Sequence, residues 1–315
     1  MENATAAISG QPKSRFLGFF LLLALVNLMW SAQGTAVKFL EGKLGPIAIT
    51  FLPFYATTVL LVPLLLRERR RNARAASVTR ADWLRFIAVG VGGQVLAQLG
   101  MTWGITRSLA SNAAILNLLI PVITAVLASF LLRERVTRLR VACLLVGLAG
   151  VFLLSVPDLE QSSFLQANYL TGNLLILCGC LGSAFYNVYC KGLLQRFSEI
   201  EILIFSYLTA SVASVPLLIW VEPFRFAQLA ALDWRGWLAF AFLAFFLYGL
   251  SMVLFFYVLQ HLPVTVASAS LYLVPVFGIL LAALFLGERL TPTALAGTVI
   301  VLASTILIMK WDKVA

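Results

Sequence analysis

Uncharged polar side chains recur at helical spacing inside long apolar stretches of this chain. Asn27 and Ser31 are four residues apart, and so are Gln94 and Gln98. Residues four apart lie on one face of an α-helix, and polar residues inside apolar helices usually face the interior of a bundle. Amides, hydroxyls and aromatic rings around one cavity can bind a small neutral or zwitterionic solute. We therefore predict a substrate site made of Asn27, Trp30, Ser31, Gln94, Gln98, Asn117, Tyr186, Asn187, Tyr248 and Tyr272.

The same side chains also have a structural interpretation. Amides and hydroxyls tie neighbouring helices together through hydrogen bonds worth about 0.6 kcal/mol each, and aromatic rings at helix ends anchor in the membrane interface. Both roles stay open for every predicted site residue. One pattern makes a sharper prediction, because the series from Asn27 through Ser31 to Lys38 lies on one face if the first apolar stretch is a single helix.

Residues able to do covalent or acid–base chemistry are scarce. His261 is the single histidine, which leaves no plausible zinc set. Cys143, Cys178, Cys180 and Cys190 all lie in apolar stretches, where packing is the favoured role. No Asp or Glu lies in the middle of a stretch, so the buried carboxylate that proton-coupled carriers commonly use is missing. We expect no enzyme, no metal and no cofactor.

The composition indicates which elements carry these residues. Of 315 residues, 61% are hydrophobic and 11% are charged, and the mean hydropathy is +0.97. A soluble domain carries about 25% charged residues, so a water-soluble core and a disordered chain are both excluded. A membrane-spanning helix needs roughly 20 apolar residues. Ten such segments are predicted, at 16–40, 46–66, 83–104, 111–132, 138–156, 170–190, 202–221, 236–259, 264–286 and 293–310.

The distribution of positive charge predicts the orientation. With the N-terminus in the cytosol and ten helices, 17 of the 23 Lys and Arg residues fall on the cytosolic side, as the positive-inside rule requires. We therefore expect a multi-pass protein of the bacterial inner membrane with both termini cytosolic. The arginine run between Arg67 and Arg85 also fits an acidic-lipid or nucleic-acid patch, although the orienting role is favoured. The net charge of +10 then needs no nucleic-acid partner.

An internal repeat divides the chain into halves. At a constant offset of 154, Pro121 pairs with Pro275 and Glu134 with Glu288, and ten of the 27 positions from 111 to 137 are identical to their counterparts. Each half contains five predicted helices. Because five is odd, the second half enters the membrane from the opposite side, which is the inverted repeat of many secondary transporters. Pro121 and Pro275 should interrupt the hydrogen bonding of the fourth helix in each half.

The residues of this repeat resemble a known family. Residues 267–292, ASASLYLVPVFGILLAALFLGERLTP, together with Gly297, are similar to the EamA domain of the drug/metabolite transporter superfamily. The copy from Pro121 to Thr137 is similar but has Arg133 in place of Gly287. The resemblance covers two tandem copies and implies ten helices that export or exchange small metabolites. We expect an all-α integral membrane protein with ten transmembrane helices in two inverted five-helix repeats, at 16–156 and 170–310, after a cytosolic tail at 1–15.

The function expected from these patterns is transport by alternating access around a central cavity, with amino acids or amphipathic compounds as cargo. A passive channel, a non-transporting scaffold and a membrane enzyme are the alternatives. The expected partners are the lipid bilayer and a small-molecule substrate, and a homodimer stays open. Asn117→Leu or Gln98→Leu is expected to abolish transport without preventing insertion.

Overall fold

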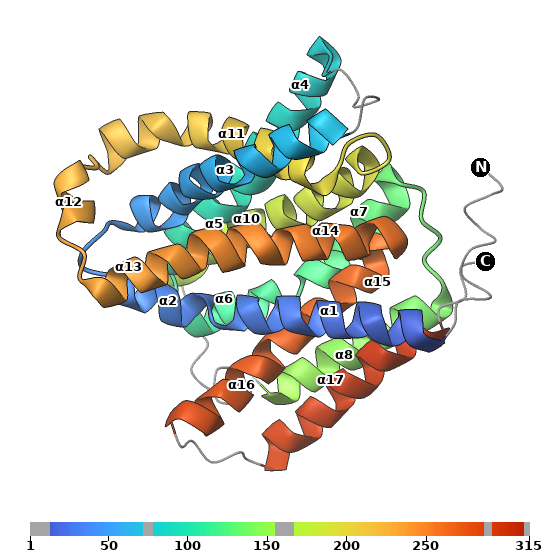
Figure 1. Ribbon diagram of the computed structural model, residues 1–315. Helices are drawn as coiled ribbons and strands as arrows, with labels where there is room; N and C mark the ends of the chain where they lie inside the picture. Colours follow the sequence, from blue (N-terminus) through green and yellow to red (C-terminus); the bar gives the residue numbers. More distant parts are fainter. Residues whose placement is uncertain (1–12, 72–77, 155–166, 287–291, 312–315) are drawn as a thin grey trace.

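The structure, a computed structural model, describes residues 13–71, 78–154, 167–286 and 292–311. These residues form helices and turns, with no strand among them (Figure 1). The helices are, in chain order, α1 (Lys13–Ser31), α2 (Gln33–Leu40), α3 (Pro46–Arg71), α4 (Arg80–Ile87), η2 (Ala88–Val95), α5 (Leu96–Ile105), α6 (Ala110–Asn117), α7 (Ile120–Leu131), α8 (Arg138–Leu154), α10 (Ala167–Leu193), α11 (Glu199–Pro216), η3 (Leu217–Val221), α12 (Phe226–Ala230), α13 (Trp234–Ala241), η4 (Phe242–Ser251), α14 (Met252–His261), α15 (Val264–Ala269), η5 (Ser270–Tyr272), α16 (Leu273–Leu286) and α17 (Pro292–Trp311).

Nine helical stretches within the described ranges are long and apolar enough to cross a membrane. The predicted all-α membrane class is therefore confirmed. The segment predicted at 138–156 corresponds to α8, whose 17 residues make it shorter than the other nine. A count of ten spans stays a prediction.

Polar side chains define where several helices begin. Thr79 and Asp82 form a capping box at the start of α4, and Ser198 and Glu201 form one at the start of α11. In each box the hydroxyl accepts from a backbone amide of the first turn while the carboxylate accepts from the capping residue's own amide. Asp233 begins α13 by accepting from the Gly236 amide at 2.9 Å. Each of these polar groups marks the point where an apolar helix starts.

The two halves share the irregularities of their third and fourth helices. The fourth helix of the first half breaks between α6 and α7, and its counterpart breaks between α15 and α16. Pro121 lies in the first turn of α7, where its missing N–H costs no intrahelical bond. The third helix widens into π-helical turns in both halves, at η2 from Ala88 and at η4 from Phe242, again 154 residues apart. The repeat therefore extends to local backbone geometry.

The packing relates the halves by a pseudo-twofold exchange. Helix α8 packs along its equivalent α17, and α3 packs along its equivalent α11 (Figure 1). Glu222, after η3, accepts from the Ile47 and Ala48 amides at 3.0 Å each. At the other end Ser198 donates to Glu68, 154 residues before Glu222, at 3.2 Å. Because the end of each helix meets the start of its equivalent, α3 and α11 are antiparallel, as an inverted repeat requires.

Equivalent ion pairs lie at the two ends of the bundle. Lys43 pairs with Asp233 at 2.5 Å, and Arg196 pairs with Asp82 at 3.0 Å. Both pairs join the connection before the second helix of one half to the start of the third helix of the other. The hydrogen bond from Lys43, followed by that from the Gly236 amide, lowers the pKa of the Asp233 carboxyl below its usual value.

The first apolar stretch departs from the predicted single face. Helix α1 ends at Ser31 and α2 begins at Gln33, because the Ala32 amide donates three residues back, to the Met29 carbonyl at 3.3 Å. This tighter turn rotates the residues that follow, so Lys38 is exposed while Asn27 is completely buried. The prediction of one continuous polar face is wrong. The first twelve residues of the predicted tail at 1–15 and the Glu288–Arg289 pair lie outside the described residues, while residues 13–15 belong to α1.

Candidate functional site

One cluster, around the predicted site residue Tyr248, joins the first helix of the first half to the third helix of the second half. The Gln33 amide donates to the Tyr248 hydroxyl at 3.4 Å, and the Tyr207 hydroxyl donates to the Tyr248 backbone carbonyl at 3.1 Å. The π-helical geometry of η4 makes such a carbonyl available, since wider turns disturb the regular i to i−4 bonding. Phe54 packs 4.5 Å from the Tyr248 ring, centroid to centroid.

A second cluster is the pseudo-symmetric counterpart of the cluster around Tyr248. Here the amide belongs to the third helix and the phenol to the first helix, the reverse of the first cluster. Gln94 lies on η2, 154 residues before Tyr248, and its amide interacts electrostatically with the Tyr186 phenol on α10. The Tyr186 hydroxyl also contacts the Ser206 hydroxyl at 3.1 Å. Each half therefore contributes an amide–phenol pair between its third helix and the first helix of the other half.

A third group of contacts surrounds Asn27 and Trp30. The Asn27 amide donates to the Leu23 carbonyl at 2.7 Å and to the Ser270 hydroxyl at 3.0 Å. The Trp30 indole donates to the Ser251 hydroxyl at 2.9 Å. Helix α1 is thereby tied to η4 and η5, two of the irregular helical segments of the second half.

Asn117 lies at the corresponding break of the first half. Its amide nitrogen is 3.8 Å from the Met101 sulfur, and its oxygen accepts from the Cys180 thiol at 3.6 Å. Cys180 also donates to the Leu116 carbonyl at 3.5 Å, one of the carbonyls at the end of α6. Asn117 thus joins the broken fourth helix to α10, as Ser270 joins its equivalent to α1.

The remaining predicted residues lie apart from these clusters. The Ser31 hydroxyl donates back to the Leu28 carbonyl of its own helix at 2.7 Å. Gln98 is half-buried on α5, and Asn187 is buried on α10. Tyr272 is 1% exposed and packs against Gly147 of α8. Ser31 is therefore placed as a local helix contact, whereas Tyr272 is placed in the packing between the fourth and fifth helices.

Several buried polar atoms have no hydrogen-bond partner within the described ranges. They include the Asn27 side-chain oxygen and the hydroxyls of Thr124 and Tyr272. These three residues belong to α1, α7 and η5; α1 packs on η5, and α7 packs on α15, the helix that precedes η5. An unpaired buried polar group costs about 1–3 kcal/mol, so this region has unused capacity to bind a polar ligand.

Charged side chains fasten the turn between α14 and α15. Lys191 of α10 donates to the carbonyls of Leu259, Gln260 and Leu262, where α14 ends. A cation at a helix C-terminus complements both the unpaired carbonyls and the helix dipole. Lys191 therefore binds protein carbonyls at the end of α14 rather than extending to the lipid headgroups.

Glu134 holds the other side of the same turn. Its carboxylate accepts from the Val264 amide at 2.9 Å and from the Thr265 hydroxyl at 3.1 Å, and it lies 3.7 Å from the Arg140 guanidinium. Glu134 therefore both caps the start of α15 and forms a salt bridge. Its ion-pair partner is Arg140 rather than the adjacent Arg133 or Arg135.

The contact between α5 and α10 is built from small residues. A Cβ added to Gly100 would lie 2.6 Å from the Gly179 backbone nitrogen, and one added to Gly182 would lie 2.6 Å from the Ala97 nitrogen. Only glycine allows backbones to approach this closely, as in small-xxx-small contacts of membrane helices. The two helices are therefore closed against each other backbone to backbone.

The comparisons with known proteins follow the same two-part division. The model of the EamA-like transporter family matches residues 17–156 and again residues 170–310. The chain belongs to the EamA-like transporter family. The predicted resemblance is confirmed, and its two matches correspond to the two helical repeats of the structure.

Relatives of this EamA-family protein cover most of its length. An uncharacterised transporter of Archaeoglobus fulgidus is 24% identical over 92% of this chain and 98% of its own. The "Probable terminal-alkyne amino-acid exporter" of Streptantibioticus cattleyicolor is 29% identical over 73% of this chain and 75% of its own. The S-adenosylmethionine uptake transporter of Rickettsia conorii is 25% identical over 95% of this chain and 94% of its own. A crystal structure with 18% identity matches the fold over 92% of this chain and 97% of its own, with a TM-score of 0.75.

Sequence reasoning about this EamA-family protein missed Gln33, Ser251 and Ser270 as partners of predicted residues. The sequence did not distinguish Ser251 and Ser270 from the other hydroxyl residues of the apolar helices. Gln33 reaches Tyr248 from the start of α2, directly after the helix break at Ala32. Small residues at Gly93, Ala97, Gly100 and Gly104 were a readable signal for close helix packing. Among the described residues, no group of three or more His, Cys, Asp or Glu is placed to hold a metal ion.

Proposed function

We propose that this EamA-family protein exports or exchanges small zwitterionic metabolites by alternating access. The proposal rests on two helix–helix contacts, that of α5 with α10 and that of α14 with α1. The two contacts are equivalent in the repeat and lie at opposite ends of the pseudo-symmetric bundle. The first contact is closed backbone to backbone, whereas the second is made by side chains such as Phe19 and His261, whose rings are 5.3 Å apart. Opening one while closing the other would expose the centre to each side in turn.

The proposed binding region lies between these contacts. Its polar groups are those of the predicted site, foremost Asn27, Gln94, Asn117 and Tyr248, with Trp30 and Tyr186 as aromatic walls. The unpaired atoms of Asn27, Thr124 and Tyr272 support this placement, because a bound solute would satisfy them. Ser31, Gln98, Asn187 and Tyr272 complete the proposed set.

The substrate class follows from chemistry shared by two relatives. One is named as an amino-acid exporter and the other as an S-adenosylmethionine uptake transporter, and both compounds carry an α-amino carboxylate. Amides and hydroxyls can hydrogen-bond both ends of such a zwitterion. We propose an α-amino acid or derivative as cargo, moved without a protonating carboxylate at membrane depth.

The proposed setting follows the charge distribution. Both termini lie in the cytosol, the membrane is a bacterial inner membrane, and the repeats span 16–156 and 170–310 after a short tail. A homodimer is compatible with this arrangement but is not required by it, because each chain contains both halves of the site.

Counterflow in proteoliposomes tests the proposal. Vesicles preloaded with unlabelled methionine or S-adenosylmethionine should accumulate the labelled compound transiently, with saturation, and without a pH gradient. A passive pore would give neither counterflow nor saturation, and strict dependence on a pH gradient would contradict uncoupled exchange.

The site itself is tested with matched variants. Asn117→Leu and Gln98→Leu should each reduce flux by about tenfold or more, because losing one buried hydrogen bond to a charged ligand costs at least about 1.4 kcal/mol. The exposed Asn168→Leu and Gln195→Leu are the controls and should transport normally. Normal flux in both Asn117→Leu and Gln98→Leu would remove these residues from the site.

A further inference from the structure

The last turns of α3 carry more positive charge than the fold uses. Arg69 is engaged, with its guanidinium 2.8 Å from the Glu201 carboxylate and 5.6 Å from the centre of the Phe205 ring. Arg67, Arg70 and Arg71 have no ion-pair partner within the described ranges. An orienting role at insertion needs only their charge, so it does not account for their arrangement around a groove.

A groove of about 420 Å³ lies beside these arginines. It is lined by Pro63, Leu66, Arg67, Arg70 and Arg71. These positions follow helical spacing on one side of α3. The groove therefore runs from apolar side chains at one end to three guanidinium groups at the other.

The apolar end of this groove belongs to a lipid-facing surface. Leu66 is 51% exposed, Leu60 is 50% exposed and Val59 is 70% exposed, all on the same membrane-spanning helix. Exposed apolar side chains on such a helix contact acyl chains. The three arginines follow within the next two turns, at the level where hydrocarbon gives way to headgroups.

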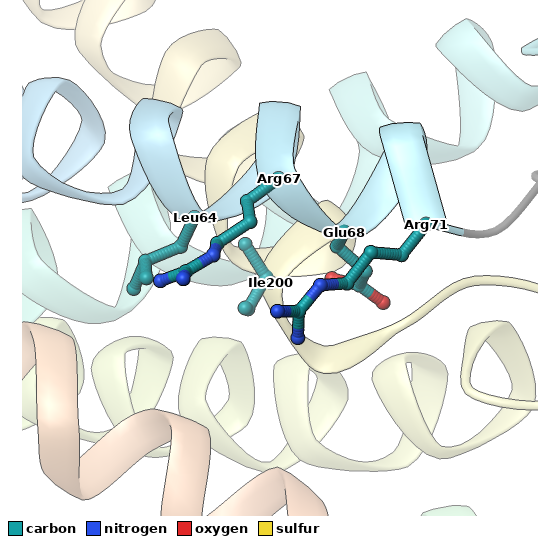
Figure 2. A pocket seen from close by; sticks show the side chains of 5 residues that line it. All are labelled: Leu64, Arg67, Glu68, Arg71 and Ile200. Atoms are coloured by element: carbon teal, nitrogen blue, oxygen red, sulfur yellow. The ribbon is translucent and has the colours of Figure 1, made fainter.

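A second groove, of about 310 Å³, lies on the other flank of Arg67 and Arg71 and is lined also by Leu64, Glu68 and Ile200. Figure 2 shows both guanidinium groups extending along this flank, with the Glu68 carboxylate beside Arg71. That carboxylate accepts from the Ser198 hydroxyl at 3.2 Å and would repel a phosphate. The acid-free groove is therefore the one suited to an anion.

We propose that the groove formed by Pro63, Leu66, Arg67, Arg70 and Arg71 binds one anionic glycerophospholipid. Guanidinium groups bind phosphate oxygens through paired, charge-assisted hydrogen bonds. Pro63 and Leu66 contact an acyl chain. A net negative headgroup is favoured over a zwitterionic one because three cations meet it with no acid in the groove. The site is independent of the proposed transport function.

Native mass spectrometry of the purified full chain tests this site. With phosphatidylglycerol and phosphatidylcholine supplied in equal amounts, the wild type should retain one tightly bound phosphatidylglycerol. The triple variant Arg67→Gln, Arg70→Gln, Arg71→Gln should bind it about a hundredfold more weakly, since each basic residue near an anionic lipid contributes about fivefold. Arg70→Gln alone is the milder variant should the triple variant fail to fold.

A matched control separates this site from net charge. Arg133→Gln, Arg135→Gln, Arg138→Gln also removes three exposed arginines and should retain the lipid. Equal loss in both triple variants, retention in the first, or no preference for phosphatidylglycerol in the wild type would overturn the proposal. Displacement of the lipid by millimolar inorganic phosphate would also overturn it, because a lipid held by its acyl chain resists a free anion.

Discussion

The α5–α10 contact and the α14–α1 contact are equivalent in topology but differ in construction. Gly100 and Gly104 on α5 correspond, at the offset of 154, to Leu254 and Val258 on α14. On the partner helices, Gly179 corresponds to Leu25, which is 42% exposed and does not fill the interface. Two copies of one helix pair can thus have different closures, because glycine permits backbone contact and larger side chains keep backbones apart.

The ion pairs at the two ends of the bundle also occupy equivalent positions but differ in construction. The Asp82 side chain is inaccessible and contacts both Arg85 and Arg196, whereas the Asp233 side chain is 50% exposed and pairs with Lys43. Topology places an ion pair at both ends, but burial differs between them. The following substitutions compare a closely packed or buried position with a more open one.

The largest difference is expected between Gly100→Ala and Gly34→Ala. The new Cβ at Gly100 meets the Gly179 backbone at 2.6 Å, whereas nothing lies within 4 Å of one at Gly34. Overpacking should lower the free energy of unfolding of Gly100→Ala by about 1–3 kcal/mol, while Gly34→Ala should be neutral or more stable. Thermal unfolding in detergent measures both, and equal melting temperatures would contradict the backbone-contact model.

Lys191→Met and Lys38→Met should differ next. Lys191 satisfies carbonyls at the end of α14, and Lys38 is exposed. Losing the cation at a helix C-terminus should cost about 1–2 kcal/mol of unfolding free energy, whereas Lys38→Met should have no measurable effect. Hydrogen exchange confined to Leu262–Thr265 locates the change, and its absence in Lys191→Met would exclude the capping role.

Asp82→Asn should lower the melting temperature more than Asp233→Asn does. The inaccessible carboxylate of Asp82 holds a helix cap and two arginines, so its loss should persist at high salt. The exposed Lys43–Asp233 pair is screened by ions. A salt titration of both variants therefore checks the difference, and an Asp233→Asn effect unchanged at 1 M salt would contradict it.

The smallest effect is a pH dependence at Asp233. Its folded-state pKa is lowered by Lys43, so the ionised carboxylate stabilises the folded state above its usual value of 3.8, and this stabilisation is lost as the pH falls through the lower folded-state pKa. The wild type should therefore melt slightly above Asp233→Asn at pH 6 and lose that advantage only below about pH 4. An advantage that disappears near neutral pH would point to another group.

Much of the fold was predictable from particular residues. The apolar stretches predicted the helices, and the Pro121–Pro275 pair predicted the equivalent breaks in the fourth helices, because proline restarts a helix more readily than it continues one. Glu134 was predictable as a cap from its position at a helix end. The partner of Glu134 was not predictable, since Glu134 caps α15, which lies 130 residues away in the chain.

The sequence by itself determined the helical class, the two repeats and the family. The length of each apolar segment and the constant offset of 154 can be read along the chain without knowing which segments meet in space. The tertiary structure decided which polar groups meet. A single tightened turn at Ala32 directs Gln33 toward Tyr248 and leaves Lys38 exposed, while Lys191 turns to the end of α14. Such outcomes depend on helix rotation and contact between distant segments, and periodicity along one segment contains no information on either.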